Sequence, residues 1–134
     1  MPKQIIVSSN APTTGFTDET TPSPLAQAIR TGDLLFVSGQ RPLDPKTSEV
    51  VSPDIREQTR QTLANLQSIL SAPGLTLANV VNMRVVLRNT EDFPIFNEAF
   101  REFLTGERIT RTCIGATPHR KGVNVEIDCA ATFI

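Results

Sequence analysis

The 134-residue sequence has no tryptophan and no tyrosine, and seven phenylalanines supply its aromatic side chains. This composition argues against an aromatic cage for a quaternary ammonium group and against a platform on which nucleic-acid bases stack. Thirteen Lys and Arg residues against fourteen Asp and Glu residues give a net charge of −1. The basic excess that is typical of nucleic-acid-binding proteins is therefore missing, and we expect no nucleic-acid partner.

Cysteine and histidine are also scarce. Cys113, Cys129 and His119 are too few for a disulfide framework or for a four-ligand zinc site. No apolar run approaches the ~18 residues of a membrane span, and the first residues, 1–4, resemble neither a signal peptide nor a transit peptide. We therefore expect a single soluble, cytoplasmic domain over 1–134, with no metal, no cofactor and no membrane contact.

Hydrophobic periodicity predicts an α+β domain. One amphipathic helix is expected between a cap at Ser52 or Asp54 and a closing glycine at Gly74, and a second over 93–104 with Pro94 in its first turn. The predicted strands cover 3–7, 25–30, 34–38, 81–87, 111–116 and 123–133, with a further short strand at 49–51, and the predicted loops cover 9–24 and 41–53. Two helices can cover only one face of such a sheet, so its other face is polar or is covered by another subunit, and we predict an oligomer.

Arg111 and Glu126 are the charged pair with the clearest chemical potential. They lie in predicted strands joined by a short connection, and a hairpin would bring both side chains to one end of the sheet. The planar guanidinium of arginine grips a carboxylate through two hydrogen bonds, and a glutamate can orient and deprotonate a water molecule. From the pattern alone, a structural ion pair on a solvated face is the commoner arrangement.

The other polar candidates give weaker signals. Cys113 lies two residues beyond Arg111 and faces the same side of the strand, but a packed thiol is favoured over a nucleophile because the single histidine lies in a turn six residues away. Cys129 belongs to the apolar set of the last strand. The turn around His119 is expected to be a solvated basic loop, and the backbone at Ser38 could bind an anion.

Several segments, in order along nearly the whole chain, resemble the Rid family of reactive intermediate deaminases, also called the YjgF or RidA family. They are 36–51 (FVSGQRPLDPKTSEVV), 58–70 (QTRQTLANLQSIL), 79–100 (NVVNMRVVLRNTEDFPIFNEAF) and 125–131 (VEIDCAA). The resemblance implies a chorismate-mutase-like α+β fold, with a mixed sheet of about six strands and two helices on one face. It also implies a homotrimer with ligand clefts at the subunit interfaces, and cofactor-free hydrolysis of imine and enamine intermediates to 2-keto acids and ammonia.

The same resemblance implies roles for individual residues. Arg111 matches the arginine that holds the substrate carboxylate, and Glu126 matches the glutamate that positions the attacking water. The remaining expected substrate-binding residues are Cys113, Ser38, Gly39, Asn97 and Leu25.

Because the sequence departs from the family pattern at several positions, it does not identify the substrate. Leu25 stands where the family commonly has a tyrosine, Arg41 stands where an apolar residue is more usual, and 116–120 replaces an apolar-Leu-Pro turn. One alternative is a specialised Rid-like enzyme that acts on a different imine or enamine. The other is a non-catalytic protein that binds small carboxylates or is chaperone-like. The charge and the missing aromatics make a ribonuclease the weakest reading.

Overall fold

The computed structural model describes residues 3–13, 17–18 and 21–134, which form two sheets and two α-helices. The strands are β1 (Gln4–Ile6), β2 (Thr17–Asp18), β3 (Thr21–Pro22), β4 (Ala28–Thr31), β5 (Leu34–Gln40), β6 (Val80–Leu87), β7 (Thr110–Gly115) and β8 (Val125–Thr132). The helices are α1 (Ile55–Ser71) and α2 (Phe93–Phe103), preceded by the single 3-10 turns η1 (Leu77–Asn79) and η2 (Thr90–Asp92) in front of β6 and α2 respectively.

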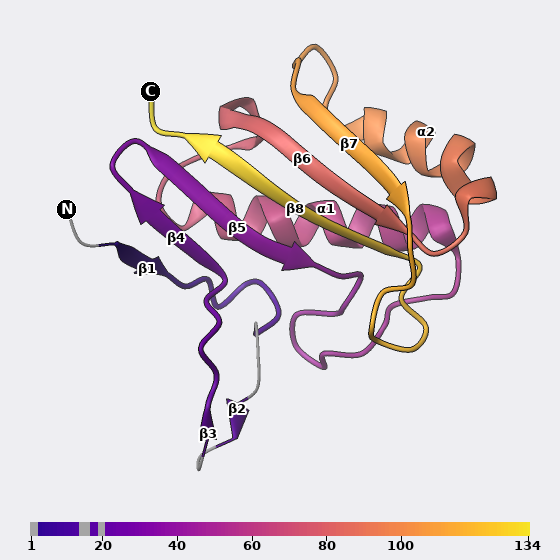
Figure 1. Cartoon of the computed structure of the whole chain (residues 1–134), viewed down its shortest axis with the longest axis horizontal. Coiled ribbons are helices and arrows are strands. Elements are labelled where there is room, and N and C mark those ends of the chain that lie inside the picture. Colours follow the sequence, from indigo (N-terminus) through magenta and orange to yellow (C-terminus); the bar gives the residue numbers. More distant parts are fainter. Residues whose placement is uncertain (1–2, 14–16, 19–20) are drawn as a thin grey trace.

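The main sheet has six strands in the order β1-β4-β5-β8-β6-β7. The β6–β7 pair is parallel, and the other neighbours are antiparallel. Figure 1 shows α1 and α2 lying behind the same face of this sheet. The predicted α+β architecture, with a mixed six-stranded sheet and two helices on one face, is confirmed.

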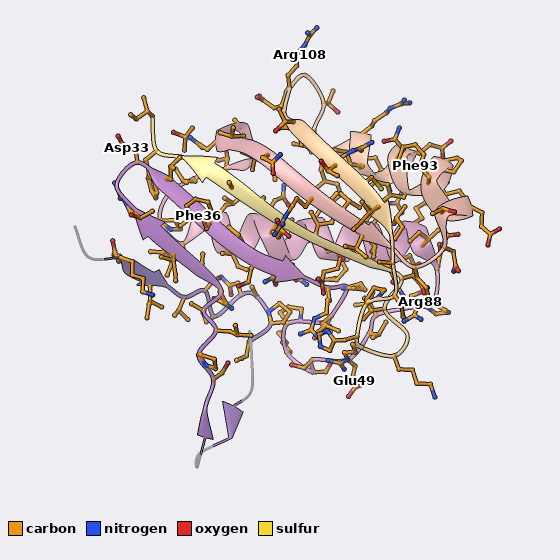
Figure 2. The ribbon with its side chains drawn as sticks, in the orientation of Figure 1. Asp33, Phe36, Glu49, Arg88, Phe93 and Arg108 are labelled. Carbon is orange, nitrogen blue, oxygen red and sulfur yellow. The ribbon has the colours of Figure 1, made fainter. Side chains whose placement is uncertain are left out.

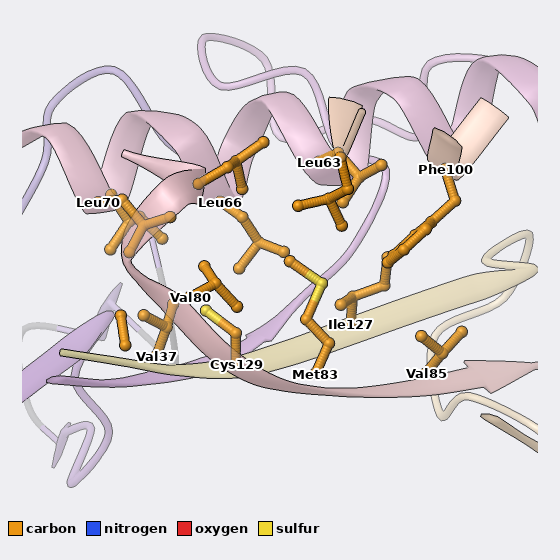
Figure 3. Close-up of a cluster of buried hydrophobic side chains, with 14 of the residues drawn as sticks. Val37, Leu63, Leu66, Leu70, Val80, Met83, Val85, Phe100, Ile127 and Cys129 are labelled. Carbon is orange, nitrogen blue, oxygen red and sulfur yellow. The ribbon is translucent and has the colours of Figure 1, made fainter. Parts of the chain in front are cut away.

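The core lies between α1 and the central strands (Figure 3). Helix α1 begins after Asp54, whose carboxylate accepts a hydrogen bond of 2.9 Å from the backbone N–H of Arg56. Its buried stripe includes the predicted positions Leu63, Leu66 and Leu70, each 0% exposed. The helix face therefore follows from the three- and four-residue spacing seen in the sequence.

Truncating Leu66 to alanine is expected to destabilise the fold by about 2–5 kcal/mol, because the methyl groups are lost and a cavity remains. The neighbouring Gln67 is exposed, so Gln67→Ala should change stability by less than about 0.5 kcal/mol. Urea unfolding of both variants measures the difference. Equal stabilities would show that α1 does not pack on the sheet as described.

The opposite face of the sheet carries no helix layer in the described part of the chain and exposes large apolar side chains. Phe36 on β5 is 51% exposed, and Ile114 on β7 is 53% exposed. Between them, Arg84 and Asp128 form an ion pair with a 3.0 Å contact. A half-apolar open face of this kind is typical of a surface that another subunit covers.

The predicted hairpin between the strands of Arg111 and Glu126 is wrong. Strand β7 pairs with β6 alone, in parallel, and β8 lies on the other side of β6, between β6 and β5. Helix α2 makes the crossover that a parallel pair requires, and the connection 116–124 is long enough to pass the end of β6. Sequence adjacency therefore did not imply spatial adjacency here.

Smaller differences concern strand ends and loops. Strand β4 begins at Ala28 rather than at Leu25, and the predicted strand at 49–51 is reduced to a single bridge between Leu43 and Val50. The predicted loop 9–24 contains the short β2–β3 pair, and its residues 14–16 and 19–20 lie outside the described residues. The hairpin at Gly32 is confirmed, with this glycine at a φ of 58° that suits a residue without a Cβ.

Candidate functional site

Arg111 extends from the edge strand β7 toward α2. It is in register with the buried Met83 of β6, so both side chains face the helix layer. Its Nη1 donates a 2.9 Å hydrogen bond to the side-chain carbonyl of Asn97. In the described part of the chain, Arg111 forms no ion pair with an Asp or Glu.

Three phenylalanine rings of α2 surround the Arg111 guanidinium. Its central carbon lies 4.8 Å from the ring centre of Phe100 and 5.6 Å from those of Phe93 and Phe96. Phe93, which Figure 2 labels on α2, and its two partners follow the three- and four-residue spacing of one helix face. The rings attract the cation through their π faces and hold it in one orientation.

A hollow of about 380 Å³ opens beside Arg111 on the helix side of the sheet edge. Asn97, Phe100 and the segment before β7 line it, including Glu107 and Arg108. Arg111 thus combines a fixed orientation, spare N–H donors and access from solvent, which are the properties needed to capture a small carboxylate.

Glu126 lies on the other face of the sheet. It alternates along β8 with the buried Val125 and Ile127 and is in register with Val86 of β6. A Cβ atom built on Gly39 would lie 2.9 Å from Oε2 of Glu126, so the absence of a side chain at Gly39 lets the carboxylate lie against β5. Any larger residue at this position would displace the carboxylate.

Ser38 and Leu25 lie beside Gly39 on this open face. The hydroxyl of Ser38 donates a 2.7 Å hydrogen bond to the carbonyl of Ala26, so its proton is already used within the chain. Leu25 is 60% exposed. Together with Gly39 and Asp128 they line a shallow hollow of about 330 Å³.

The predicted site residues therefore divide into two groups within one chain. Arg111, Cys113 and Asn97 lie at the β7 edge, and Arg111 faces the helices, whereas Glu126 lies with Ser38, Gly39 and Leu25 on the open face. The expectation that Arg111 and Glu126 meet across neighbouring strands is wrong for a single chain, because β6 separates them and they point to opposite faces.

Cys113 shares the Arg111 side of β7, as predicted from their two-residue spacing, and is half-buried. Burial raises the pKa of the Cys113 thiol, and the positive charge of Arg111 opposes this shift. Burial also raises the pKa of Cys129 to about 12, in keeping with its place in the core. Both thiols remain protonated near neutral pH, which supports the interpretation of packed cysteines.

Alkylation by iodoacetamide at pH 8 should therefore proceed more slowly at Cys113 than in an unstructured cysteine peptide, since a raised pKa lowers the thiolate fraction. Cys129 should remain unmodified until the protein unfolds. Mass spectrometry over a time course measures both rates. A Cys113 rate above that of the peptide would identify an activated thiol instead.

Sequence reasoning missed two features of the site. The three phenylalanines around Arg111 belong to the helix predicted over 93–104, and nothing in their spacing indicates which strand cation they will face. The basic turn is exposed at His119, as predicted, but the prediction did not include its contact with Arg41, in which Nε2 and Nη1 lie 3.4 Å apart. Both contacts join segments that are distant in the sequence, so no local pattern could have indicated them.

The described residues contain no group of three His, Cys, Asp or Glu side chains that could hold a metal ion. The helices within the described ranges include none that is both long and apolar enough to cross a bilayer.

Comparison with known sequences identifies relatives along most of the chain. The family model described as Endoribonuclease L-PSP matches residues 18–133. A RutC family protein of Pyrococcus horikoshii is 37% identical over 129 residues, which cover 96% of this chain and 97% of the relative. A 2-iminobutanoate/2-iminopropanoate deaminase of Dermatophagoides farinae is 30% identical over 105 residues, covering 78% of this chain and 82% of that protein.

Solved structures share the fold over nearly their full length. Escherichia coli TdcF with bound serine superposes with a TM-score of 0.84 at 30% identity, covering 96% of this chain and 98% of that one. YyfA of Yersinia pestis, described as a member of the conserved Rid protein family, gives a TM-score of 0.88 at 30% identity and covers 98% of this chain and 99% of that one. The chain therefore belongs to the Endoribonuclease L-PSP family, the Rid or YjgF family that its sequence segments resemble.

Proposed function

We propose that this protein hydrolyses reactive 2-imino acids and their enamine tautomers to 2-keto acids and ammonia, in a cleft that two copies of the chain build together. The observation that carries the proposal is the state of Arg111. Its guanidinium is oriented by Asn97 and three phenylalanine rings, forms no ion pair within the described ranges, and borders an open hollow. A cation held in this way is suited to a substrate carboxylate.

A second copy supplies the other half of the site. Glu126 lies on the open sheet face, where exposed apolar side chains such as Phe36 and Ile114 favour coverage by another subunit. The edge strand β7 borders that face. Our proposal is that a neighbouring chain packed over it presents its own Glu126 to Arg111 around this edge. The family resemblance implies a homotrimer with a cleft at each subunit interface, and the serine bound to the TdcF relative supports a small-molecule ligand.

The chemistry requires only these two groups and one water molecule. Arg111 binds the carboxylate of the imino acid, which places the C=N carbon near the water held by Glu126. Glu126 accepts a proton as the water oxygen bonds to that carbon, and the C=N double bond becomes a single bond in the carbinolamine. Glu126 passes this proton to the nitrogen, which completes the carbinolamine. Glu126 then takes the proton of the new hydroxyl group and passes it to the same nitrogen; the C–O bond becomes C=O as the C–N bond breaks, and ammonia and the 2-keto acid leave. An enamine first tautomerises to the imine.

The remaining site residues position these groups. Gly39 leaves room for the Glu126 carboxylate, and Asn97 fixes the Arg111 guanidinium. The backbone of Cys113 lines the Arg111 side. Leu25 contributes an apolar wall where a tyrosine hydroxyl is common in the family, so the site offers less polar recognition at that point.

An assay with an imine made in situ tests the proposal. An L-amino-acid oxidase supplies the imine, and a coupled dehydrogenase reports keto acid as it is released. We expect the wild-type protein to accelerate keto acid release over spontaneous hydrolysis in proportion to its concentration. No acceleration, together with an increase in melting temperature on adding a 2-keto acid, would favour the alternative of a carboxylate-binding protein without turnover.

A further inference from the structure

Two side chains at one end of the sheet form a donor pair that the proposed hydrolysis does not use. Nη1 of Arg41, which directly follows β5, lies 3.4 Å from Nε2 of His119, which lies in the connection between β7 and β8. An arginine N–H only donates, so a hydrogen bond at this contact requires the neutral tautomer in which Nε2 accepts and Nδ1 carries the proton. Neither side chain forms an ion pair with an Asp or Glu in the described part of the molecule.

The segments that carry this pair are fixed to the rest of the fold. The carbonyl of Arg41 accepts a 3.0 Å hydrogen bond from the buried Asn65 of α1. Next to His119, Arg120 donates a 2.7 Å hydrogen bond to the carbonyl of Ser48, which joins the two loops. Figure 1 shows these loops together beyond the ends of β5 and β7.

Arg88, which directly follows β6, forms a hydrogen bond with the same connection between β7 and β8. Its Nε donates a 3.1 Å hydrogen bond to the carbonyl of Val123, and Figure 2 labels it at this end of the molecule. The Arg41–His119 pair is thus held by both loops before any ligand arrives, which lowers the entropy cost of binding one.

The pair lies at the Glu126 end of the open face. In the β5–β8 ladder Gln40 is opposite Ile127, so one further step brings Arg41 level with Glu126. Gly39, two residues before Arg41, is the residue against which the Glu126 carboxylate lies. Although they are level in register, Arg41 and Glu126 form no ion pair among the described side chains, and Arg41 contacts His119 instead.

We propose, on the basis of the function proposed above, that Arg41 and His119 bind a second carboxylate at the end of the substrate side chain. The favoured substrates are then imines or enamines of acidic amino acids, with Arg111 of one copy on the main-chain carboxylate and the Arg41–His119 pair of the other on the side-chain carboxylate. An anion here accepts hydrogen bonds from spare N–H groups of both residues. A purely apolar side chain would desolvate Arg41 without compensation, and a cationic one would be repelled.

The test compares imines generated by oxidases from glutamate and from alanine, as the ratio of their kcat/KM values. Wild type should favour the acidic imine by about tenfold, the effect of one charge-assisted contact, and Arg41→Met should bring the ratio close to one. Lys46→Met removes the same charge from the same loop without touching His119, and should leave the ratio unchanged. A wild-type ratio near one, or a ratio unaffected by Arg41→Met, would overturn the proposal.

Binding of the keto acid products separates this proposal from the catalytic one. By calorimetry, 2-oxoglutarate should bind about tenfold more tightly than pyruvate to wild type, and equally tightly to Arg41→Met. If 2-oxoglutarate binds more tightly than pyruvate but neither imine is turned over, the hydrolase proposal is refuted and the second carboxylate site is supported. If both imines are turned over, and neither the kcat/KM ratio nor keto acid binding favours the acidic compound, the hydrolase proposal is supported and the second carboxylate site is refuted.

Discussion

Replacing Arg111 with alanine is expected to reduce kcat/KM for imine hydrolysis by about a hundredfold, since hydrogen bonds to a charged group contribute about 1.5–3 kcal/mol and each 1.4 kcal/mol is about tenfold in rate. Without the guanidinium, the substrate carboxylate has no cation in the hollow beside α2. Arg111→Lys keeps the charge but not the planar fork, so an intermediate loss is expected. The oxidase-coupled assay measures all three proteins.

The matched control is Arg60→Ala. Arg60 lies on α1 and forms a surface ion pair of 2.8 Å with Glu102, so its removal should change stability little and should leave hydrolysis unchanged. Melting temperature and size-exclusion chromatography confirm that each variant folds and assembles. Wild-type activity in Arg111→Ala, with assembly intact, would show that the carboxylate binds elsewhere.

Mixing two inactive variants is expected to restore activity. Arg111→Ala keeps Glu126, and Glu126→Gln keeps Arg111. A cleft that takes its arginine side from a Glu126→Gln chain and its glutamate side from an Arg111→Ala chain therefore contains both groups. If three chains exchange at random in equal amounts, about a quarter of the interface sites contain an intact Arg111 and an intact Glu126. The measurement is the assay on variants unfolded together, refolded and compared with each variant refolded alone.

The mixing experiment distinguishes a site within one chain from a site shared between two chains, because the two sites predict different results. A site within one chain would stay inactive in every mixture, because each chain lacks one of the two groups. The positions in the fold favour the shared site: Arg111 faces α2, and Glu126 faces away from the helices. No recovery, from mixed oligomers shown by mass spectrometry to contain both variants, would contradict a cleft built between subunits.

Much of the fold could be predicted because it depends on local chemistry. The alternation of Val125, Ile127 and Cys129 with polar residues predicts a strand with one buried face, and the structure buries these three. The cap at Asp54 likewise follows from short-range hydrogen bonding. The segments 36–51, 58–70, 79–100 and 125–131 indicated the family, because they resemble it in order along nearly the whole chain, and the family model matches residues 18–133.

Strand order and side-chain pairing could not be predicted in this way. The short connection between β7 and β8 suggested a hairpin, but the parallel crossover through α2 places β6 between them. The contact between Arg41 and His119 spans 78 residues and depends on how two loops pack at the end of the sheet. Such contacts are decided by the packing of whole elements rather than by propensities of neighbouring residues.

The sequence by itself determined the helices, the alternating strands and the absence of a disulfide framework, because these depend on residue types and short spacings. Only the tertiary structure decided that Arg111 faces the helices while Glu126 faces the open side. The physical reason is that successive strand residues point to opposite faces, so the face that a side chain shares with a distant residue depends on strand order and register. The same geometry is the reason why the proposed chemistry invokes a second copy of the chain.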